Sequence, residues 1–254
     1  METKLIDMLN SLEGEIGFYY KDLKTGKEIK YKEDEPLIAA SIIKIPILIE
    51  ILRQIEEGRL KKDQKVKVQR EDKMPSCGAL TYMHNGLEVT IEDLYTLMII
   101  HSDNTATNML IKISGMENIN NTMKNLGLKK SKLNRLLFDS EEQKKGKENY
   151  ITSFEMGILL EKMNSYRLIS ENISKEIDRV LKLQRLNHKI PYLIPNNIEI
   201  GHKTGEDSGI THDVGVVYSK NPFIFCFTSN KTNVIQAETI LREMALICYE
   251  NSTI

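Results

Sequence analysis

The chain has 254 residues, of which 41% are hydrophobic and 28% are charged, an ordinary composition for a soluble globular protein of one large or two small domains. Its 35 basic and 36 acidic residues give a formal net charge of -1, which argues against a dedicated nucleic-acid-binding protein with a basic excess. The three cysteines are too few and too scattered for a disulfide framework or a four-ligand zinc site.

The first residues do not resemble a secretory signal peptide, because they carry acidic side chains early and contain no sufficiently long apolar stretch. The longest apolar run, IIKIPILIEIL, is interrupted by Lys44 and Glu50 and is too short to span a bilayer. As written, the chain is expected to be a cytoplasmic monomer without a membrane span, unless it is a secreted protein given without its leader.

Hydrophobic periodicity and turn residues predict the elements in chain order. The N-terminal half begins with an amphipathic helix over 2–13, a hairpin of EIGFYY and EIKYK around the turn DLKTG, and a buried helix over about 41–57. A capping-box pattern at Thr90 and Asp93 opens a helix to about 101, and another helix runs from about 104 to Ser114. Thr152 opens a further helix, and 170–184 is also helical.

The C-terminal part changes character, because three β-rich segments follow at hairpin-like spacing and precede a final helix. These segments are IEIGHKTG, THDVGVVYS and PFIFCFTS. Since both ends of the chain supply strands, we predict an α/β (α+β) fold in which one antiparallel sheet is flanked by helices and an all-helical subdomain is inserted. The sheet subdomain is expected from about 1–38 and 190–254 and the helical subdomain from about 39–189, with a cleft where the two meet.

The segment around Ser41 and Lys44 carries the first chemical signal. Apolar residues surround the expected helix on all sides, so Lys44 must either reach solvent or lie buried with a partner. Ser41 lies three residues earlier and therefore on the same helical face. Burial favours the neutral amine, which accepts a proton from a serine nucleophile. A helix cap at Ser41 and a solvated Lys44 remain the alternative, because S-x-x-K alone is a common pattern.

Two further tripeptides favour the interpretation of Ser41 and Lys44 as a catalytic pair over a helix cap with a solvated lysine. Ser102-Asp103-Asn104 lies between two predicted helices, and Lys203-Thr204-Gly205 lies on a predicted strand. Together with S-x-x-K, in this order, they form the motif set of class A β-lactamases and penicillin-binding proteins. The chain resembles that serine hydrolase superfamily, and class A most closely, over nearly its whole length. The resemblance implies a β-lactamase/transpeptidase-like fold, the one predicted from the order of elements.

The resemblance assigns catalytic roles to residues of these motifs. Ser41 is expected to be the acylated nucleophile and Lys44 its general base. Ser102 is expected to pass a proton to the lactam nitrogen as it leaves. Asn104 would hold the amide of the substrate side chain and brace Lys44. Lys203 would place positive charge near Ser102 and the substrate carboxylate.

The resemblance also assigns substrate-binding groups on the strand. Thr204 is expected to donate a hydrogen bond to the substrate carboxylate. The oxyanion hole is expected at two backbone N–H groups, one of Ser41 and one just beyond Gly205, near Glu206 or Asp207. Gly205 and Glu206 are thereby expected to contact the substrate. No metal or organic cofactor is implied.

One departure from class A concerns hydrolysis of the acyl-enzyme. Class A enzymes carry a glutamate in a pattern like E-x-x-L-N, which activates the deacylating water, and the region LNRLLFDSEEQKKGKENYITSFEM lacks this pattern. Counting back from YITSFEM makes Asp139 the best acidic candidate, although its side chain is one methylene shorter. Either Asp139 positions the water, or it caps a helix or pairs with Arg135. Without a competent base, the acyl-enzyme would be long-lived.

Three other functions stay open at this stage. A D,D-peptidase-like or other amidohydrolase acting on a peptidoglycan-like acyl substrate is favoured by the missing glutamate pattern. A glutaminase of the same superfamily is disfavoured by the presence of both SDN and KTG. A non-catalytic penicillin-binding module is disfavoured by the intact set of motif residues. Cys77 falls where the family has a loop at the mouth of the cleft, and we interpret it as an idle thiol rather than a ligand contact.

Overall fold

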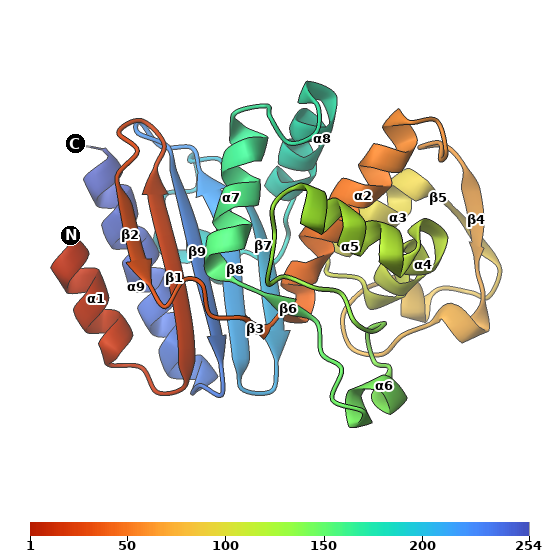
Figure 1. Cartoon of the computed structure of the whole chain (residues 1–254), viewed down its shortest axis with the longest axis horizontal. Helices are drawn as coiled ribbons and strands as arrows, with labels where there is room; N and C mark the ends of the chain where they lie inside the picture. Colours follow the sequence, from red (N-terminus) through yellow and green to blue (C-terminus); the bar gives the residue numbers. More distant parts are fainter. Residues whose placement is uncertain (254) are drawn as a thin grey trace.

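The computed structural model describes residues 1–253, and both ends of the chain build one five-stranded sheet (Figure 1). Its strand order is β2-β1-β9-β8-β7, and every neighbouring pair is antiparallel. The strands are β1 (Glu15–Asp22), β2 (Glu28–Tyr31), β7 (Ile200–Asp207), β8 (Ile210–Val217) and β9 (Phe223–Asn230). The predicted hairpin and the three predicted C-terminal strands are confirmed, and β7 with its KTG sequence is an edge strand of the sheet.

Successive side chains of a strand point to opposite faces of the sheet, and both faces are apolar. Each face packs into a separate hydrophobic core. On β1, Phe18 and Tyr20 pack beneath the terminal helices, while Tyr19 points to the opposite core. Figure 1 shows α1 (Glu2–Asn10) and α9 (Val234–Ser252) on one face and α7 (Ser153–Asn164) on the other. Helix α7 approaches so closely that a Cβ atom built on Gly157 would lie 2.2 Å from Tyr19 Cδ1.

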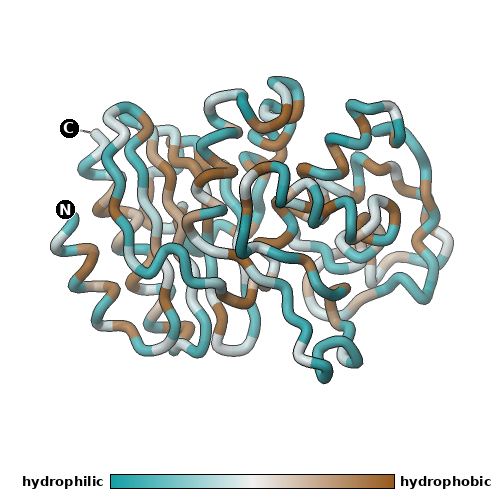
Figure 2. Tube along the Cα trace, in the orientation of Figure 1, coloured by the Kyte–Doolittle hydropathy of each residue, from teal (hydrophilic) through white to brown (hydrophobic). Residues whose placement is uncertain are grey.

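Several of the remaining helices contact α2 (Lys44–Glu56), whose residues are almost all buried. Figure 2 shows hydrophobic residues along α2 and the central strands and mainly hydrophilic residues on the loop that carries α6. The other helices are α2 (Lys44–Glu56), α3 (Ile91–Ile100), α4 (Asn104–Ser114), α5 (Met116–Asn125), α6 (Ser140–Lys144) and α8 (Glu171–Lys182). The chain also has four short 3-10 turns in its described residues: η1 (Ala40–Ile43), η2 (Arg70–Asp72), η3 (Leu80–Tyr82) and η4 (Ile190–Leu193). Two pairs of short strands complete the structure, β3 (Leu37–Ile38) with β6 (Tyr150–Ile151) and β4 (Lys65–Val68) with β5 (Leu87–Thr90).

The capping residues begin the helices where the sequence indicates. Thr90 Oγ1 accepts the Asp93 N–H at 3.0 Å, and Asp93 accepts the Thr90 N–H at 2.8 Å, which completes the predicted capping box. Thr152 caps α7 in the predicted position. Two boundaries differ from the prediction by three residues. The helix expected over 2–13 ends at Asn10, and the helix expected from about residue 41 begins at Lys44 and is preceded by the 3-10 turn η1.

No helix in residues 1–253 is both long and apolar enough to cross a membrane.

Candidate active site

Ser41 lies on the turn η1, at the place where α2 meets the edge strand β7. The preceding residue, Ala40, has a φ of +41°, a left-handed conformation that is strained for a residue with a side chain. This turn keeps Ser41 out of the regular helix, and Ser41 lines a cavity of about 580 Å³. The sequence did not indicate the left-handed residue, because alanine is a helix-favouring residue.

Lys44 is completely buried, and its Nζ lies within 2.9 Å of four oxygens. These are the hydroxyls of Ser41 and Ser102, the main-chain carbonyl of Ser102 and the Oδ1 of Asn104. The Asn104 amide is oriented by its Nδ2, which donates to the Pro75 carbonyl at 3.1 Å. The two C=O oxygens can only accept, so a neutral amine can donate one N–H to each and keep its lone pair for a hydroxyl proton. The geometry therefore suits a proton acceptor.

Burial sets the charge of both lysines in the site. Desolvation, with the charge of Lys203 as a second cause, holds the pKa of Lys44 well below its usual range. Burial also lowers the pKa of Lys203 to about 7, although the nearby Asp213 carboxylate opposes this shift. Lys44 is therefore disposed to be the neutral partner, as the sequence predicted from its apolar surroundings.

Ser102 bridges the two lysines. Its Oγ lies 2.9 Å from Lys44 Nζ and 3.1 Å from Lys203 Nζ, so its proton can move along one short hydrogen-bonded path. Its backbone has a φ of +53°, and the neighbouring Asp103 holds the loop in place. The Asp103 carboxylate accepts N–H groups of residues 79, 80 and 106 at 2.7–2.9 Å. The same carboxylate caps α4 and leaves no space for a Cβ on Gly78, where such an atom would lie 2.3 Å from Asp103 Cγ.

The KTG residues lie along the edge strand β7. Lys203 Nζ donates to the Thr204 carbonyl at 2.7 Å, and Thr204 is buried beside it. Gly205 and Glu206 follow, and Glu206 lines the same cavity as Ser41. Because β7 is an edge strand, alternate backbone N–H groups are not used by the sheet and remain available to a substrate oxygen.

A third buried lysine, Lys189, donates hydrogen bonds to the main chain of β7 and of the neighbouring β8, and the sequence analysis did not identify it. Lys189 is fully buried, and its Nζ donates to the carbonyls of Gly205 and His212 at 3.1 and 3.2 Å. It also lies 3.2 Å from Glu206 Oε1 and 3.8 Å from Glu238 Oε1. With His188, these two carboxylates form a group of metal-ligand spacing, but the Lys189 ammonium already supplies the positive charge between them. No local pattern marks this lysine as buried.

The carboxylates that line the cavity are already occupied by other groups. The two Glu148 oxygens accept from Arg135 and from Gln143. Glu206 pairs with His188 and Lys189, which lower its pKa to about 2. The other two lining acids are also engaged, Glu238 with Arg242 and Thr211, and Asp207 with the N–H of residue 208. Its lowered pKa makes Glu206 a poor proton acceptor.

Asp139 is not among the residues that line the cavity. Its side chain accepts the Glu142 N–H at 3.1 Å and caps α6, one of the two roles that the sequence left open. The suggested pairing with Arg135 is wrong, since Arg135 binds Glu148 at 2.6 Å across the loop. A role for Asp139 in positioning water remains an untested prediction, and no contact to a site residue supports it.

Leu137 lies in the cavity wall instead. Both of its backbone groups are fixed by one side chain: its N–H donates to Asn108 Oδ1, and its carbonyl accepts from Asn108 Nδ2, each at 2.9 Å. Cys77 is partly buried and lines the cavity, the position that the family resemblance implied for its loop.

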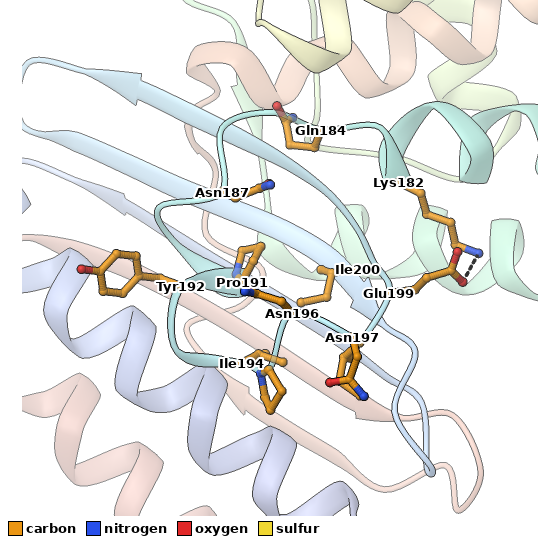
Figure 3. A pocket seen from close by; sticks show the side chains of 12 residues that line it. Lys182, Gln184, Asn187, Pro191, Tyr192, Ile194, Asn196, Asn197, Glu199 and Ile200 are labelled. Atoms are coloured by element: carbon orange, nitrogen blue, oxygen red, sulfur yellow. Dashed lines mark ion pairs between the residues drawn. The ribbon is translucent and has the colours of Figure 1, made fainter.

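A second cavity of about 470 Å³ lies on the loop between α8 and β7, away from Ser41 (Figure 3). Its wall is rich in amide side chains and prolines, and Lys182 and Glu199 form an ion pair at 3.2 Å on its rim. None of the motif residues lines it.

A serine and a buried lysine, hydrogen-bonded to a second serine and a second lysine, lie between an edge strand and a helical layer. This is the arrangement of a serine hydrolase active site. Comparison with known proteins agrees. The model of the beta-lactamase enzyme family matches residues 1–252. The chain therefore belongs to the β-lactamase enzyme family.

Two relatives and two solved structures are similar to this chain over 82–98% of its length. Beta-lactamase VEB-1 of Pseudomonas aeruginosa is 24% identical, with 98% of this chain and 89% of the relative covered. Beta-lactamase SME-1 of Serratia marcescens is 24% identical, with 82% and 73% covered. A β-lactamase structure from Sphaerobacter thermophilus has a TM-score of 0.90 and 26% identity, with 98% and 96% covered. The structure of PBP-A has a TM-score of 0.89 and 22% identity, with 98% and 94% covered.

Proposed function

We propose that the protein reacts with β-lactams by forming an acyl-enzyme on Ser41, and that this acyl-enzyme is hydrolysed slowly. The observation that carries the proposal is the position of Lys44 Nζ, 2.9 Å from both the Ser41 and the Ser102 hydroxyl oxygens. A neutral amine placed between two hydroxyls can take a proton from one and return it to the other.

The steps of acylation balance within these residues. Ser41 Oγ attacks the lactam carbonyl carbon while its proton passes to Lys44. The C–N bond of the lactam then breaks, and the Ser102 hydroxyl gives its proton to the departing nitrogen. Lys44 returns a proton to Ser102, so the site regains its starting protonation state with the acyl group on Ser41. The charged form of Lys203 favours the anionic substrate and the transfer from Ser102.

The N–H of Ser41 and an outward N–H of β7 at Glu206 would stabilise the negative charge that develops on the carbonyl oxygen. Thr204 and Gly205 would hold the substrate carboxylate end, and Asn104 would hold the side-chain amide. These assignments rest on the motif positions and on the lining of one cavity by Ser41, Asn104 and Glu206.

Deacylation needs a water molecule and a base, and each of the four carboxylates in the cavity wall already accepts at least one hydrogen bond. The four acids in its wall are engaged by other groups, and Asp139 caps α6 outside it. A D,D-peptidase-like enzyme acting on a peptidoglycan-like acyl substrate is the second candidate. The same observation favours it, because such an enzyme does not need to hydrolyse a β-lactam acyl group rapidly.

Labelling with a fluorescent penicillin tests the proposal. The wild-type protein should become labelled and should retain most of the label after excess unlabelled penicillin is added, whereas Ser41→Ala should not be labelled. Failure of the wild type to label would contradict acylation. Loss of the label within seconds, together with rapid hydrolysis of nitrocefin, would contradict slow deacylation.

A further inference from the structure

The loop between α8 and β7 contacts both of the segments that bring Ser102 and Lys203 together. These two residues are 101 positions apart in the chain, yet Ser102 Oγ lies 3.1 Å from Lys203 Nζ. Ser102 follows the end of α3, and Lys203 lies on β7. The proton transfer from Ser102 depends on the contact with Lys203, so the side chains that hold α3 against β7 matter for the reaction.

Gln184, at the start of this loop, joins the two segments. It is 4% exposed, and its Nε2 donates to the carbonyl of Ile99 at 3.0 Å and to that of His202 at 3.3 Å. Its Oε1 accepts the N–H groups of residues 185 and 186 at 3.0 and 3.1 Å. Because carbonyls face one end of the amide and N–H groups face the other, the partners determine its orientation. One buried side chain therefore connects the end of α3 to the strand β7.

Both carbonyls lie where a donor from outside their own element is needed. Ile99 is in the last turn of α3, and the carbonyls of a last turn have no partner within the helix. The next carbonyl, that of Ile100, accepts the main-chain N–H of Arg185 at 3.1 Å. His202 lies on β7, one side of which is not paired with another strand. Without the Gln184 amide, water could reach these two carbonyls only if α3 and β7 moved apart.

The bond to His202 acts on the edge of β7 that orients Lys203. Main-chain groups of alternate residues point to the same edge of a strand, so the carbonyl of Thr204 points the same way as that of His202. The Thr204 carbonyl accepts from Lys203 Nζ at 2.7 Å. A displacement of the strand at His202 would therefore move an acceptor that holds the Lys203 ammonium.

The rest of the loop is tied to the same strand by a buried ion pair. His202 Nδ1 lies 2.9 Å from Asp213 Oδ1, and His202 Nε2 lies 3.0 Å from Asn187 Oδ1. Asp213 also accepts the Ile190 N–H at 3.0 Å, and its side chain is completely buried. These contacts fix the loop on β7, so the Gln184 amide is a rigid bridge to α3.

We propose that Gln184 is a positioning residue for acylation, whose amide holds α3 against β7 and thereby keeps the Ser102 hydroxyl within hydrogen-bond distance of Lys203. The side chain lines the second cavity, away from Ser41, so it acts through Ser102 and Lys203 and not on the substrate (Figure 3). This inference rests on the proposed function, in which Ser102 gives its proton to the lactam nitrogen.

The test replaces the amide by an apolar group of similar length, in Gln184→Met. The matched control is Gln54→Met, because Gln54 is also 4% exposed and its Nε2 donates to a helix-terminal carbonyl, that of Ser114, at 2.9 Å. Gln54 and Ser114 lie at the ends of α2 and α4 opposite to Lys44 and Asn104. Two constants are measured with benzylpenicillin: the first-order rate constant of acylation at saturation, and the dissociation constant of the complex that precedes it. Thermal melting shows that each variant is folded at the assay temperature.

The acylation rate constant of Gln184→Met should fall about tenfold, because a shift of about 1 Å in a reacting group can cost up to about 100-fold. Its dissociation constant should stay unchanged, and Gln54→Met should keep both constants. A wild-type acylation rate constant in Gln184→Met would overturn the proposal. An equal loss in Gln54→Met, or a loss confined to the dissociation constant, would do the same.

Gln184→Glu provides a second readout in a side chain of the same shape. An ionised carboxylate cannot donate to the two carbonyls, whereas a protonated carboxyl can donate to one of them, and burial favours the protonated form. Its acylation rate constant, divided by that of the wild type at the same pH, should therefore rise as the pH falls from about 8 to about 6. A ratio that does not change with pH would contradict the role of the amide as a donor.

Two further outcomes separate this inference from the proposed function. If neither Gln184 variant folds while Gln54→Met does, Gln184 is required for the fold and the positioning role is overturned, with acylation of Ser41 intact. Absence of acylation of the wild type would instead overturn the proposed function itself.

Discussion

Replacing Leu137 by glutamate should supply the base that the cavity lacks. Leu137 lines the cavity with Ser41, and Asn108 holds both of its backbone groups at 2.9 Å, so a side chain at this position starts from a fixed point. Glu148 and Glu206 in the cavity wall are paired with Arg135 and Lys189, so these two cations already have carboxylate partners. The new carboxylate of Leu137→Glu would not replace either of them in its ion pair. It would therefore be free to accept a proton from a water molecule near the acyl-enzyme.

A positioned general base contributes roughly 100- to 10,000-fold to a rate. Because the cavity is open and only one side chain holds the Leu137 backbone, we expect the lower end, about 100-fold in the deacylation rate, or about 2.7 kcal/mol of activation free energy. The rate is measured by the recovery of free enzyme after a pulse of benzylpenicillin.

Two variants control for changes in shape and charge. Leu137→Gln has the same shape without a base, and Leu136→Glu adds the same charge at a residue that does not line the cavity. Both should deacylate at the wild-type rate. Equal acceleration in Leu137→Glu and Leu137→Gln, or no acceleration in either, would refute the argument that a free carboxylate is the missing component.

Two further predictions concern stability. Burial lowers the pKa of Lys203 to about 7 from its usual 10.5. Between these two pH values Lys203 is protonated in the unfolded chain and mostly deprotonated in the folded one. The free energy of unfolding should therefore increase as pH rises through this window. In urea titrations between about pH 7 and about pH 9.5, the wild type should gain on the order of 2 kcal/mol relative to Lys203→Met, and parallel pH curves would contradict the shift. Gly157→Ala should cost about 1–3 kcal/mol, because its Cβ would lie 2.2 Å from Tyr19. Gly201→Ala, whose Cβ would meet its nearest neighbour at 3.4 Å, should cost less in the same assay, and equal losses would contradict the close packing of α7 on the sheet.

The sequence was sufficient for features that depend on local patterns. Alternating apolar residues identified the strands of the sheet, and Thr90 with Asp93 located the start of α3 because a capping box is a contact between residues three apart. The apolar residues around Lys44 left two alternatives, a solvated or a buried side chain, and the structure shows the buried one. The three motifs lie far apart in the chain, yet Lys44, Ser102 and Lys203 meet in the structure as the family resemblance implied.

Features that depend on the backbone or on distant partners could not be predicted in this way. Ala40 and Phe138 adopt left-handed conformations that their residue types disfavour, so no propensity indicates them. Arg135, four residues from Asp139, was one possible partner of that carboxylate, but the fold brings Glu148 to it across the loop. Lys189 is buried only because its ammonium reaches carbonyls on β7 and β8, which is a tertiary contact.

Intact-mass spectrometry of the protein after a short exposure to benzylpenicillin tests the central claim most directly. The account predicts an adduct of one opened penicillin on the wild type, located at Ser41 by peptide mapping, persisting for many minutes and absent from Ser41→Ala. An unmodified wild-type protein at every time point, or an adduct that also forms on Ser41→Ala, would contradict it.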